Sequence, residues 1–153
     1  MEIIKLQKND IKNALDLVWI IFQEFEALDY SKEGIEEFRE FIAYNSIIER
    51  FDRGELFFWG CIDNNDLVGV IATRGINHIC MMFVNKEYHR RGIARSLFQT
   101  VKERCKIQND INEITVNSSP YAIEVYHHLG FFDTDKEQTV NGIRFTPMSY
   151  IVK

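Results

Sequence analysis

The sequence predicts a mixed α/β domain in which a mostly antiparallel sheet of about seven strands is flanked by about four helices. Apolar runs of strand length alternate along the chain with stretches whose apolar residues recur at helical spacing. Two turns rich in asparagine, at residues 63–66 and 141–142, connect neighbouring strand-like runs. A strand at residues 79–84 leads through a short basic turn into a long helical pattern that begins at residue 93.

The first third of the chain predicts one strand followed by two helices. Residues 2–7 form a short strand-like run, and Asn9-Asp10 is suited to cap a helix whose apolar face extends to Phe25. Ser31 is suited to cap a second helix with an apolar face that extends to Ile42. These two apolar faces are expected to lie in the core.

The rest of the chain supplies the sheet. The predicted elements, in chain order, are a hairpin of strands 56–62 and 67–72, a strand 79–84, a helix from 93, a strand 113–117, a helix from Ser119-Pro120 and a last hairpin around 141–142.

The basic turn before the long helix is suited to hold an anion. Gly92 lacks a Cβ, so the backbone can approach a ligand closely, and the small Ala94 keeps the start of the helix open. The first N–H groups of a helix have no partner within it and lie at the positive end of its dipole. Arg90, Arg91 and Arg95 add positive charge. The turn is therefore either a cradle for a pyrophosphate or an ordinary connection with a solvated basic surface.

The composition predicts one acidic domain that covers residues 1–153. Hydrophobic residues make up 46% of the chain, and the net charge of −5 argues against a broad nucleic-acid-binding surface while suiting a cationic substrate. Cys61, Cys80 and Cys105 show no metal-ligand spacing and are expected to be buried thiols in a reducing cytosol. No signal-peptide pattern or membrane-spanning apolar run is present, so we expect a cytoplasmic protein that binds neither membrane nor metal.

Two motifs resemble the GCN5-related N-acetyltransferase (GNAT) family. Residues 89–94, His-Arg-Arg-Gly-Ile-Ala, are similar to its acetyl-CoA signature Gln/Arg-x-x-Gly-x-Gly/Ala, with His89 at a position where the family has Gln or Arg. Residues 114–122 and the run from Tyr126 to Gly130-Phe131 resemble the family's fifth strand and the helix after it. The resemblance covers essentially the whole chain and implies the GNAT fold and a transferase that moves the acetyl group of acetyl-CoA to a primary amine of a small molecule or a protein.

The resemblance also implies where acetyl-CoA binds. In the family the two middle strands part, and the pantetheine arm lies in the gap against the backbone of one strand. Asn117, Ser119 or both meet the cofactor, although Ser119 is equally suited to cap its helix alone. The implied cofactor-binding residues are Met82, Phe83, Val84, His89, Arg90, Arg91, Gly92, Ile93, Ala94, Arg95, Asn117, Ser119 and Tyr126.

The first two helices form one wall of the acceptor site in this family. The candidates for binding an amine there are Glu24, Glu26, Asp29 and Tyr30, with Glu26 and Tyr30 as the expected substrate-binding residues. The alternative interpretation is that these are solvated charges at a helix end.

Attack of an amine on a thioester requires an N–H donor for the oxyanion, an acceptor for the amine proton and an acid for the thiolate. The resemblance implies backbone donors around Met82 and Val84 and makes Tyr126 the acid, whereas a purely structural role would make Tyr126 a core tyrosine. His78 is the candidate base, because an imidazole titrates near the working pH. A structural histidine, with water carrying the proton away, is the alternative.

A non-catalytic acyl-CoA-binding module is the second function that this sequence allows, since the predicted fourth and fifth strands carry no carboxylate at the places where some relatives have their base. Homodimerisation through edge strands or the last hairpin, which is frequent among relatives, is left open. The acceptor amine does not follow from these residues.

Overall fold

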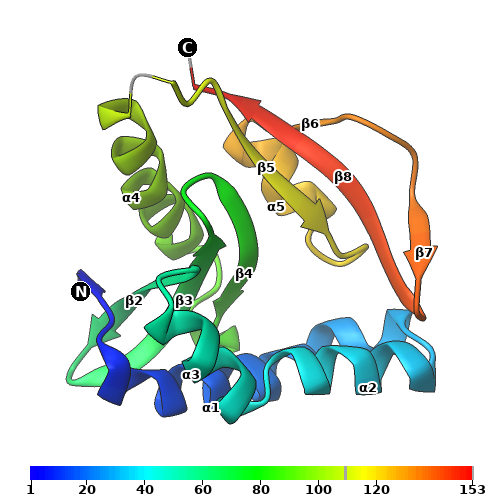
Figure 1. Cartoon of the computed structure of the whole chain (residues 1–153), viewed down its shortest axis with the longest axis horizontal. Helices are drawn as coiled ribbons and strands as arrows, with labels where there is room; N and C mark the ends of the chain where they lie inside the picture. The colour runs from blue at the N-terminus through cyan, green and yellow to red at the C-terminus, as the bar shows by residue number, and fades with distance from the viewer. Residues whose placement is uncertain (109, 153) are drawn as a thin grey trace.

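The computed structural model describes residues 1–108 and 110–152, and its largest element is an eight-stranded sheet (Figure 1). The strands are β1 (Glu2–Lys5), β2 (Leu56–Asp63), β3 (Asp66–Arg74), β4 (His78–Val84), β5 (Glu113–Ser118), β6 (Phe132–Asp133), β7 (Gln138–Val140) and β8 (Ile143–Ile151). They lie in the order β1-β2-β3-β4-β5-β8-β6, with β7 paired to β8 outside this path. Every described pairing is antiparallel except that of β4 with β5, so the predicted mixed sheet is confirmed.

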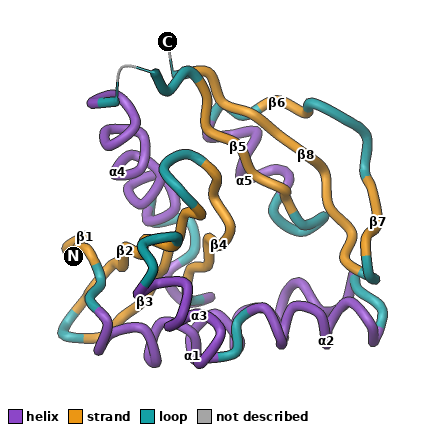
Figure 2. The backbone as a smooth tube through the Cα atoms, viewed as in Figure 1, coloured by secondary structure: helices purple, strands orange, loops and turns teal. Residues whose placement is uncertain are grey.

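Five α-helices lie around this sheet in the described part of the chain (Figure 2). They are α1 (Ile11–Ile21), α2 (Lys32–Phe41), α3 (Tyr44–Asp52), α4 (Ile93–Ile107) and α5 (Ile123–Leu129). The shorter helical segments are the 3₁₀ turns η1 (Lys8–Asp10), η3 (Ala27–Asp29) and η4 (Lys86–Tyr88) and a π-helix, η2 (Phe22–Glu26). Helix α3, strand β6 and the π-helix are not among the elements predicted from the sequence. None of the helices in the described ranges has the length and apolar character needed to cross a membrane.

Strands β4 and β5 part soon after they meet. Their parallel pairing is limited to His78 with Thr115 and Ile79 with Val116, and beyond it the strands diverge toward α1 and α2 (Figure 1). A bulge at Cys80 lies in β4 just after the last of these pairs. The divergence leaves the backbone of the second half of β4 without a strand partner on the β5 side.

The sheet separates two apolar cores. The core beneath α4 and α5 includes Leu97, Val101, Ile114, Leu129 and Met148. The core beneath α1, α2 and α3 includes Ile11, Phe22, Ile47, Phe58 and Met81. Full burial of one such side chain stabilises the fold by about 1.5–3 kcal/mol, so both faces of β4 are held firmly while its edge toward β5 stays open.

Both asparagine-rich turns adopt the predicted hairpin geometry. Asn64 and Asn65 have φ values of 50° and 68°, and Asn141 and Gly142 have φ values of 52° and 80°. A left-handed conformation at both central positions is typical of the turns that match the twist of a two-residue hairpin.

The predicted helix caps differ in outcome. Ser31 caps α2 as expected, because its Oγ accepts a hydrogen bond from the N–H of Gly34 at 3.2 Å. Asp10 precedes α1 but makes no capping bond to it, and its carboxylate accepts from the N–H of Gln7 at 2.7 Å. The reason is η1, which places one extra helical turn before α1.

The β7–β8 hairpin packs against α2 and so joins the two parted halves of the molecule on the side opposite α4 (Figure 1). Gly34 of α2 and Gly142 of the hairpin lie backbone against backbone, and the side-chain amide of Asn141 donates to Glu37 at 3.2 Å. The space between β4 and β5 is therefore bounded by α2 and this hairpin.

Candidate active site

Two cavities lie where β4 and β5 part. The larger, of about 640 Å³, lies between the end of β4, the first turn of α4 and α5, and we call it the α4 cavity. The smaller, of about 290 Å³, lies between β4, the end of β5 and α2, and we call it the α2 cavity. Both are lined by Glu26, Met82, Phe83 and Ala122, so these residues mark the junction of the two cavities.

The first turn of α4 forms one end of the α4 cavity. Gly92 has φ +79° and directly precedes the helix, and Arg90 is also left-handed, with φ +64°. The N–H groups of this first turn have no carbonyl partner within the helix. Arg90 and Arg95 line the same end of the cavity, so this place combines unpaired backbone donors with positive charge and suits a phosphate group.

Most of the residues predicted to bind the cofactor line the α4 cavity. They are Met82, Phe83, Val84, His89, Arg90, Gly92, Ile93, Ala94 and Arg95. Arg91 differs, because its guanidinium lies over the ring of Tyr88, 4.9 Å from the centroid. His89 fixes the turn against β4, since its Nε2 is 2.8 Å from the carbonyl oxygen of Val84.

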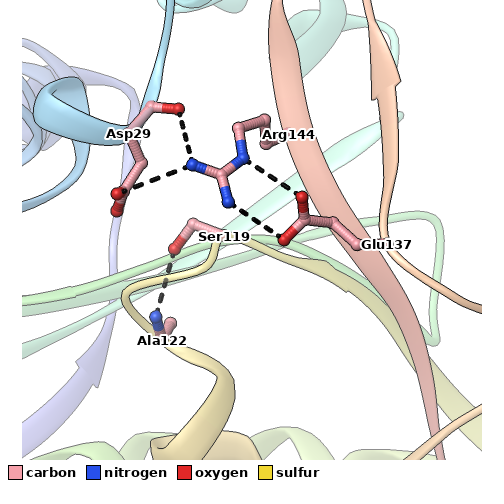
Figure 3. Close-up of polar contacts among 5 residues, drawn as sticks. All are labelled: Asp29, Ser119, Ala122, Glu137 and Arg144. Atoms are coloured by element: carbon pink, nitrogen blue, oxygen red, sulfur yellow. Dashed lines mark hydrogen bonds and ion pairs between the residues drawn. The ribbon is translucent and has the colours of Figure 1, made fainter.

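Asn117, Ser119 and Tyr126 lie along the α2 cavity and not along the α4 cavity. Ser119 accepts a hydrogen bond from the N–H of Ala122 at 3.3 Å through its Oγ, so it caps the turn that leads into α5 (Figure 3). The expectation that these three residues bind the cofactor stays a prediction, and any such contact would occur near the junction.

His78 lines the α2 cavity at the start of β4. Its Nδ1 is 2.8 Å from Oγ1 of Thr115, the residue opposite it in β5. Burial, helped by the nearby charge of Arg74, lowers the pKa of His78 to about 4. The imidazole is therefore uncharged at neutral pH and only weakly basic.

Tyr126 is both a core residue and a cavity residue. Its ring is 4% exposed and meets Phe131 edge to face at 5.3 Å, and it also lines the α2 cavity. Burial raises the pKa of the Tyr126 phenol, with a smaller contribution from Glu26, so the phenol keeps its proton at any working pH.

Glu26 lies at the junction of the two cavities and is 9% exposed. Burial raises the pKa of its carboxyl to about 7, a hydrogen bond with Ser119 lowers the pKa in part, and the charge of Asp29 raises it. No ion pair within residues 1–108 and 110–152 includes Glu26. The sequence predicts Glu26 as an amine-binding residue, but its burial does not follow from the sequence pattern.

The π-helix determines this position of Glu26. The N–H of Ala27 donates to the carbonyl of Phe22 in an i to i+5 bond, the pattern of a π-helix. The same segment places Phe25 against Tyr121 at 5.0 Å and His89 at 5.3 Å, between ring centroids. The π-helix thus contacts both sides of the α4 cavity.

The segment after the π-helix is held by the last hairpin. Arg144 Nε donates to Glu137 at 3.1 Å, and its Nη1 donates to the backbone oxygen of Asp29 at 3.4 Å (Figure 3). Asp29 is therefore engaged by Arg144, and Glu24 is 40% exposed and 3.8 Å from Lys86. Of the four candidates for amine binding, Glu26 and Tyr30 are the ones that line the α2 cavity.

The sequence matches a family model described as an acetyltransferase (GNAT) domain over residues 26–152. The chain is also similar to the UPF0157 protein YqkA of Bacillus subtilis (strain 168), with 28% identity over 89 residues. That match covers 56% of this chain and 26% of YqkA, so the chain spans about a quarter of that relative's length.

Solved structures share the whole fold at low sequence identity. A GCN5-related N-acetyltransferase from Rhodopseudomonas palustris has a TM-score of 0.83 at 18% identity, covering 98% of this chain and 94% of that one. The PaiA N-acetyltransferase of Thermoplasma acidophilum in complex with coenzyme A has a TM-score of 0.77 at 21% identity, covering 98% of both chains. A spermidine N-acetyltransferase SpeG chimera from Vibrio cholerae and hSSAT has a TM-score of 0.66 at 16% identity, covering 99% of this chain and 95% of that one.

Proposed function

This chain belongs to the acetyltransferase (GNAT) domain family, and from that membership we propose that it transfers the acetyl group of acetyl-CoA to a primary amine of a small molecule or a protein. The observation that carries the proposal is the α4 cavity. It joins the open edge of β4 to the first turn of α4, where unpaired N–H groups and two arginines meet.

Acetyl-CoA fits this geometry part by part. The pyrophosphate lies at the first turn of α4, beside Arg90 and Arg95, and the pantetheine arm runs along the open edge of β4. The coenzyme A complex of the PaiA N-acetyltransferase, a protein of the same fold, supports acyl-CoA as the donor. The thioester then lies near the junction, where backbone N–H groups of β4 around Met82 and Val84 are the proposed oxyanion donors.

The α2 cavity is the proposed site of the acceptor amine. Glu26 and Tyr30 bind it, and the carboxylate of Glu26 attracts an ammonium group.

The free thiols of Cys61, Cys80 and Cys105 support a reducing compartment, which agrees with a cytoplasmic enzyme. A homodimer remains compatible with this site.

The donor is tested by calorimetric titration. Acetyl-CoA is expected to bind, and acetyl-pantetheine, which lacks the pyrophosphate, is expected to bind at least about tenfold more weakly because it leaves the cradle empty. Replacing Arg90 and Arg95 together by alanine should remove most of this difference. Lys106→Ala, at the opposite end of α4, is the matched control. Equal affinity for both compounds would contradict the cradle, and no binding of acetyl-CoA would remove the proposed donor.

Tyr126→Phe is expected to lower kcat by about 100-fold while acetyl-CoA binding stays unchanged, because the phenol supplies the proton for the departing thiolate. The ring itself is kept, so its packing on Phe131 should persist. Steady-state release of the free thiol measures the rate. Full turnover by the variant would make Tyr126 a core residue only.

For removal of the amine proton the α2 cavity offers two side chains, His78 and Glu26. His78 keeps its place as a proposed base, with His78→Asn as its test, since asparagine can keep a hydrogen bond to Thr115 but accepts no proton. Strong loss of turnover in this variant at neutral pH would favour the imidazole.

A further inference from the structure

We propose that Glu26 accepts the proton of the acceptor's ammonium group and that the acceptor is a monoamine with an apolar body. The proposal deepens the proposed function and rests on it. Glu26 was expected only to bind the amine, and the sheet strands on which some relatives carry a base provide no carboxylate at the junction.

The position of Glu26 is the first argument. The attacking nitrogen comes from the α2 cavity and the thioester from the α4 cavity, so the two reactants meet where the cavities join. Glu26 lines both cavities, whereas His78 lines only the α2 cavity, at the start of β4. Met82 and Phe83, which share the junction with Glu26, lie near the other end of that strand. A proton acceptor must be within hydrogen-bond reach of the attacking nitrogen, and this favours Glu26.

The surroundings of Glu26 are the second argument. The carboxyl is nearly buried, has no cationic partner among the described residues and lies near the Ser119 hydroxyl, which lowers its pKa in part. Its pKa of about 7 is closer to the pKa of an alkylammonium, near 10, than the pKa of an ordinary glutamate is. Proton transfer from the ammonium to Glu26 is therefore less unfavourable. The charged and titratable groups that face it or line the two cavities are Asp29, Tyr30, Arg74, His78, Cys80, Tyr88, His89, Arg90, Arg95, Tyr121, Glu124, Tyr126 and His128.

The α2 cavity also indicates the kind of amine. Its wall on the α2 side is aromatic and is made of Tyr30, Phe38 and Phe41. Glu26 and Arg74 are its charged residues, and Arg74 lies beside His78, toward the start of β4. One carboxylate satisfies one ammonium group, and a second cationic group farther along the cavity would meet the guanidinium. This composition favours an arylalkyl or alkyl monoamine over a polyamine.

The protons and electrons of the reaction balance. The ammonium gives one proton to Glu26, which passes it to solvent, and the freed electron pair forms the C–N bond to the acetyl carbonyl carbon. The C–S bond then breaks and its electron pair stays on sulfur. The thiolate takes a proton from Tyr126, and the second proton of the attacking nitrogen restores the phenol. The products are the acetamide and free coenzyme A.

The test compares two nucleophiles in the wild type, Glu26→Gln and an exposed control, Glu40→Gln. 2-Phenylethylamine is cationic at neutral pH and needs a base, whereas hydroxylamine is largely uncharged and needs none. At saturating nucleophile, Glu26→Gln is expected to lower kcat for 2-phenylethylamine by about 100-fold or more and to stay within about threefold of wild type for hydroxylamine. Loss of ammonium binding alone would raise KM and leave kcat nearly unchanged. The wild-type profile should rise with pH through about 7 and then level off, whereas the variant, which depends on the small neutral fraction of the amine, should keep rising toward the amine's own pKa near 10.

Four outcomes overturn the proposal. Equal losses for both nucleophiles would make Glu26 a structural residue, and an unchanged rate with 2-phenylethylamine would remove its role in proton transfer. The substrate class would be overturned if the wild type acetylated spermidine faster than 2-phenylethylamine. It would also be overturned if the wild type acetylated neither amine. Failure of acetyl-CoA to bind the wild type in calorimetry would instead overturn the proposed function itself, so the two failures are distinguishable.

Discussion

Glu26→Gln is expected to make the protein more stable than wild type at pH 8, by about 3 kcal/mol. In the folded protein burial raises the pKa of this carboxyl from 4.5 to about 7, whereas the unfolded chain keeps the ordinary value. Between these two pH values the folded state holds a proton that the unfolded state has lost. Wild-type stability therefore falls relative to the variant as the pH rises, because an ionised carboxylate must be kept in a buried place.

The pH dependence of this gain identifies its cause. The difference in unfolding free energy between Glu26→Gln and wild type should be near zero below pH 4.5, grow up to about pH 7 and stay constant above it. Denaturant unfolding at a series of pH values measures it, and the other titrating groups cancel because both proteins contain them. Glu40→Gln, on the exposed face of α2, should show no such trend. A difference that does not change with pH would mean that Glu26 is not held in a raised-pKa state.

Gly34→Ala is expected to destabilise the protein by about 2–3 kcal/mol, although alanine is the better helix former. Gly34 lies in the first turns of α2, and a Cβ there would run into the backbone carbonyl of Gly142. Both contacting parts are main chain, so neither can move aside by changing a rotamer. The hairpin must shift away from α2, and the α2 cavity loses part of its wall.

The matched control is Glu40→Ala in the same helix, where the side chain is exposed and alanine adds no contact. Denaturant unfolding of both variants separates helix propensity from the clash. If Gly34→Ala proved as stable as wild type, the close approach of the two glycines would not be a feature of the folded state. Acetyl-CoA affinity should change little in Gly34→Ala, because the α4 cavity lies away from this contact.

The sequence predicts the parts of the molecule that are decided by neighbouring residues. The left-handed pairs Asn64-Asn65 and Asn141-Gly142, the Ser31 cap and the Gly92 turn all depend on local backbone preferences. The apolar repeat of the long helix likewise determines one face by itself. These are the features for which local physical rules suffice.

The missing elements depend on more distant contacts. In α3, Ile47, Ile48 and Phe51 follow helical spacing, so the pattern could have been found, but β6 has only two residues and exists because it pairs with β8. The π-helix differs from an α-helix only in which carbonyl each N–H reaches, a choice that residue pattern does not reveal.

In the candidate site, too, features that depend on local sequence could be predicted and features that depend on distant contacts could not. The residues of the basic turn that line the α4 cavity could be named because their chemistry is local, whereas the stacking of Arg91 on Tyr88 could not. The burial of Glu26 and the position of Asn117, Ser119 and Tyr126 along the α2 cavity follow from how β5, α5 and the π-helix meet. A pKa depends on that burial, so the sequence could name Glu26 and not its state of ionisation.

The π-helix at residues 22–26 also determines the direction around the helix axis in which the side chains at its end point. A π turn contains about one residue more than an α turn, and each residue of an α-helix turns the chain by about 100°. Shortening this segment by a single residue would let α1 continue as a regular helix and would swing the carboxylate of Glu26 from the junction toward another face. A single additional residue in this helix thus decides whether the same fold has a carboxylate between its two cavities.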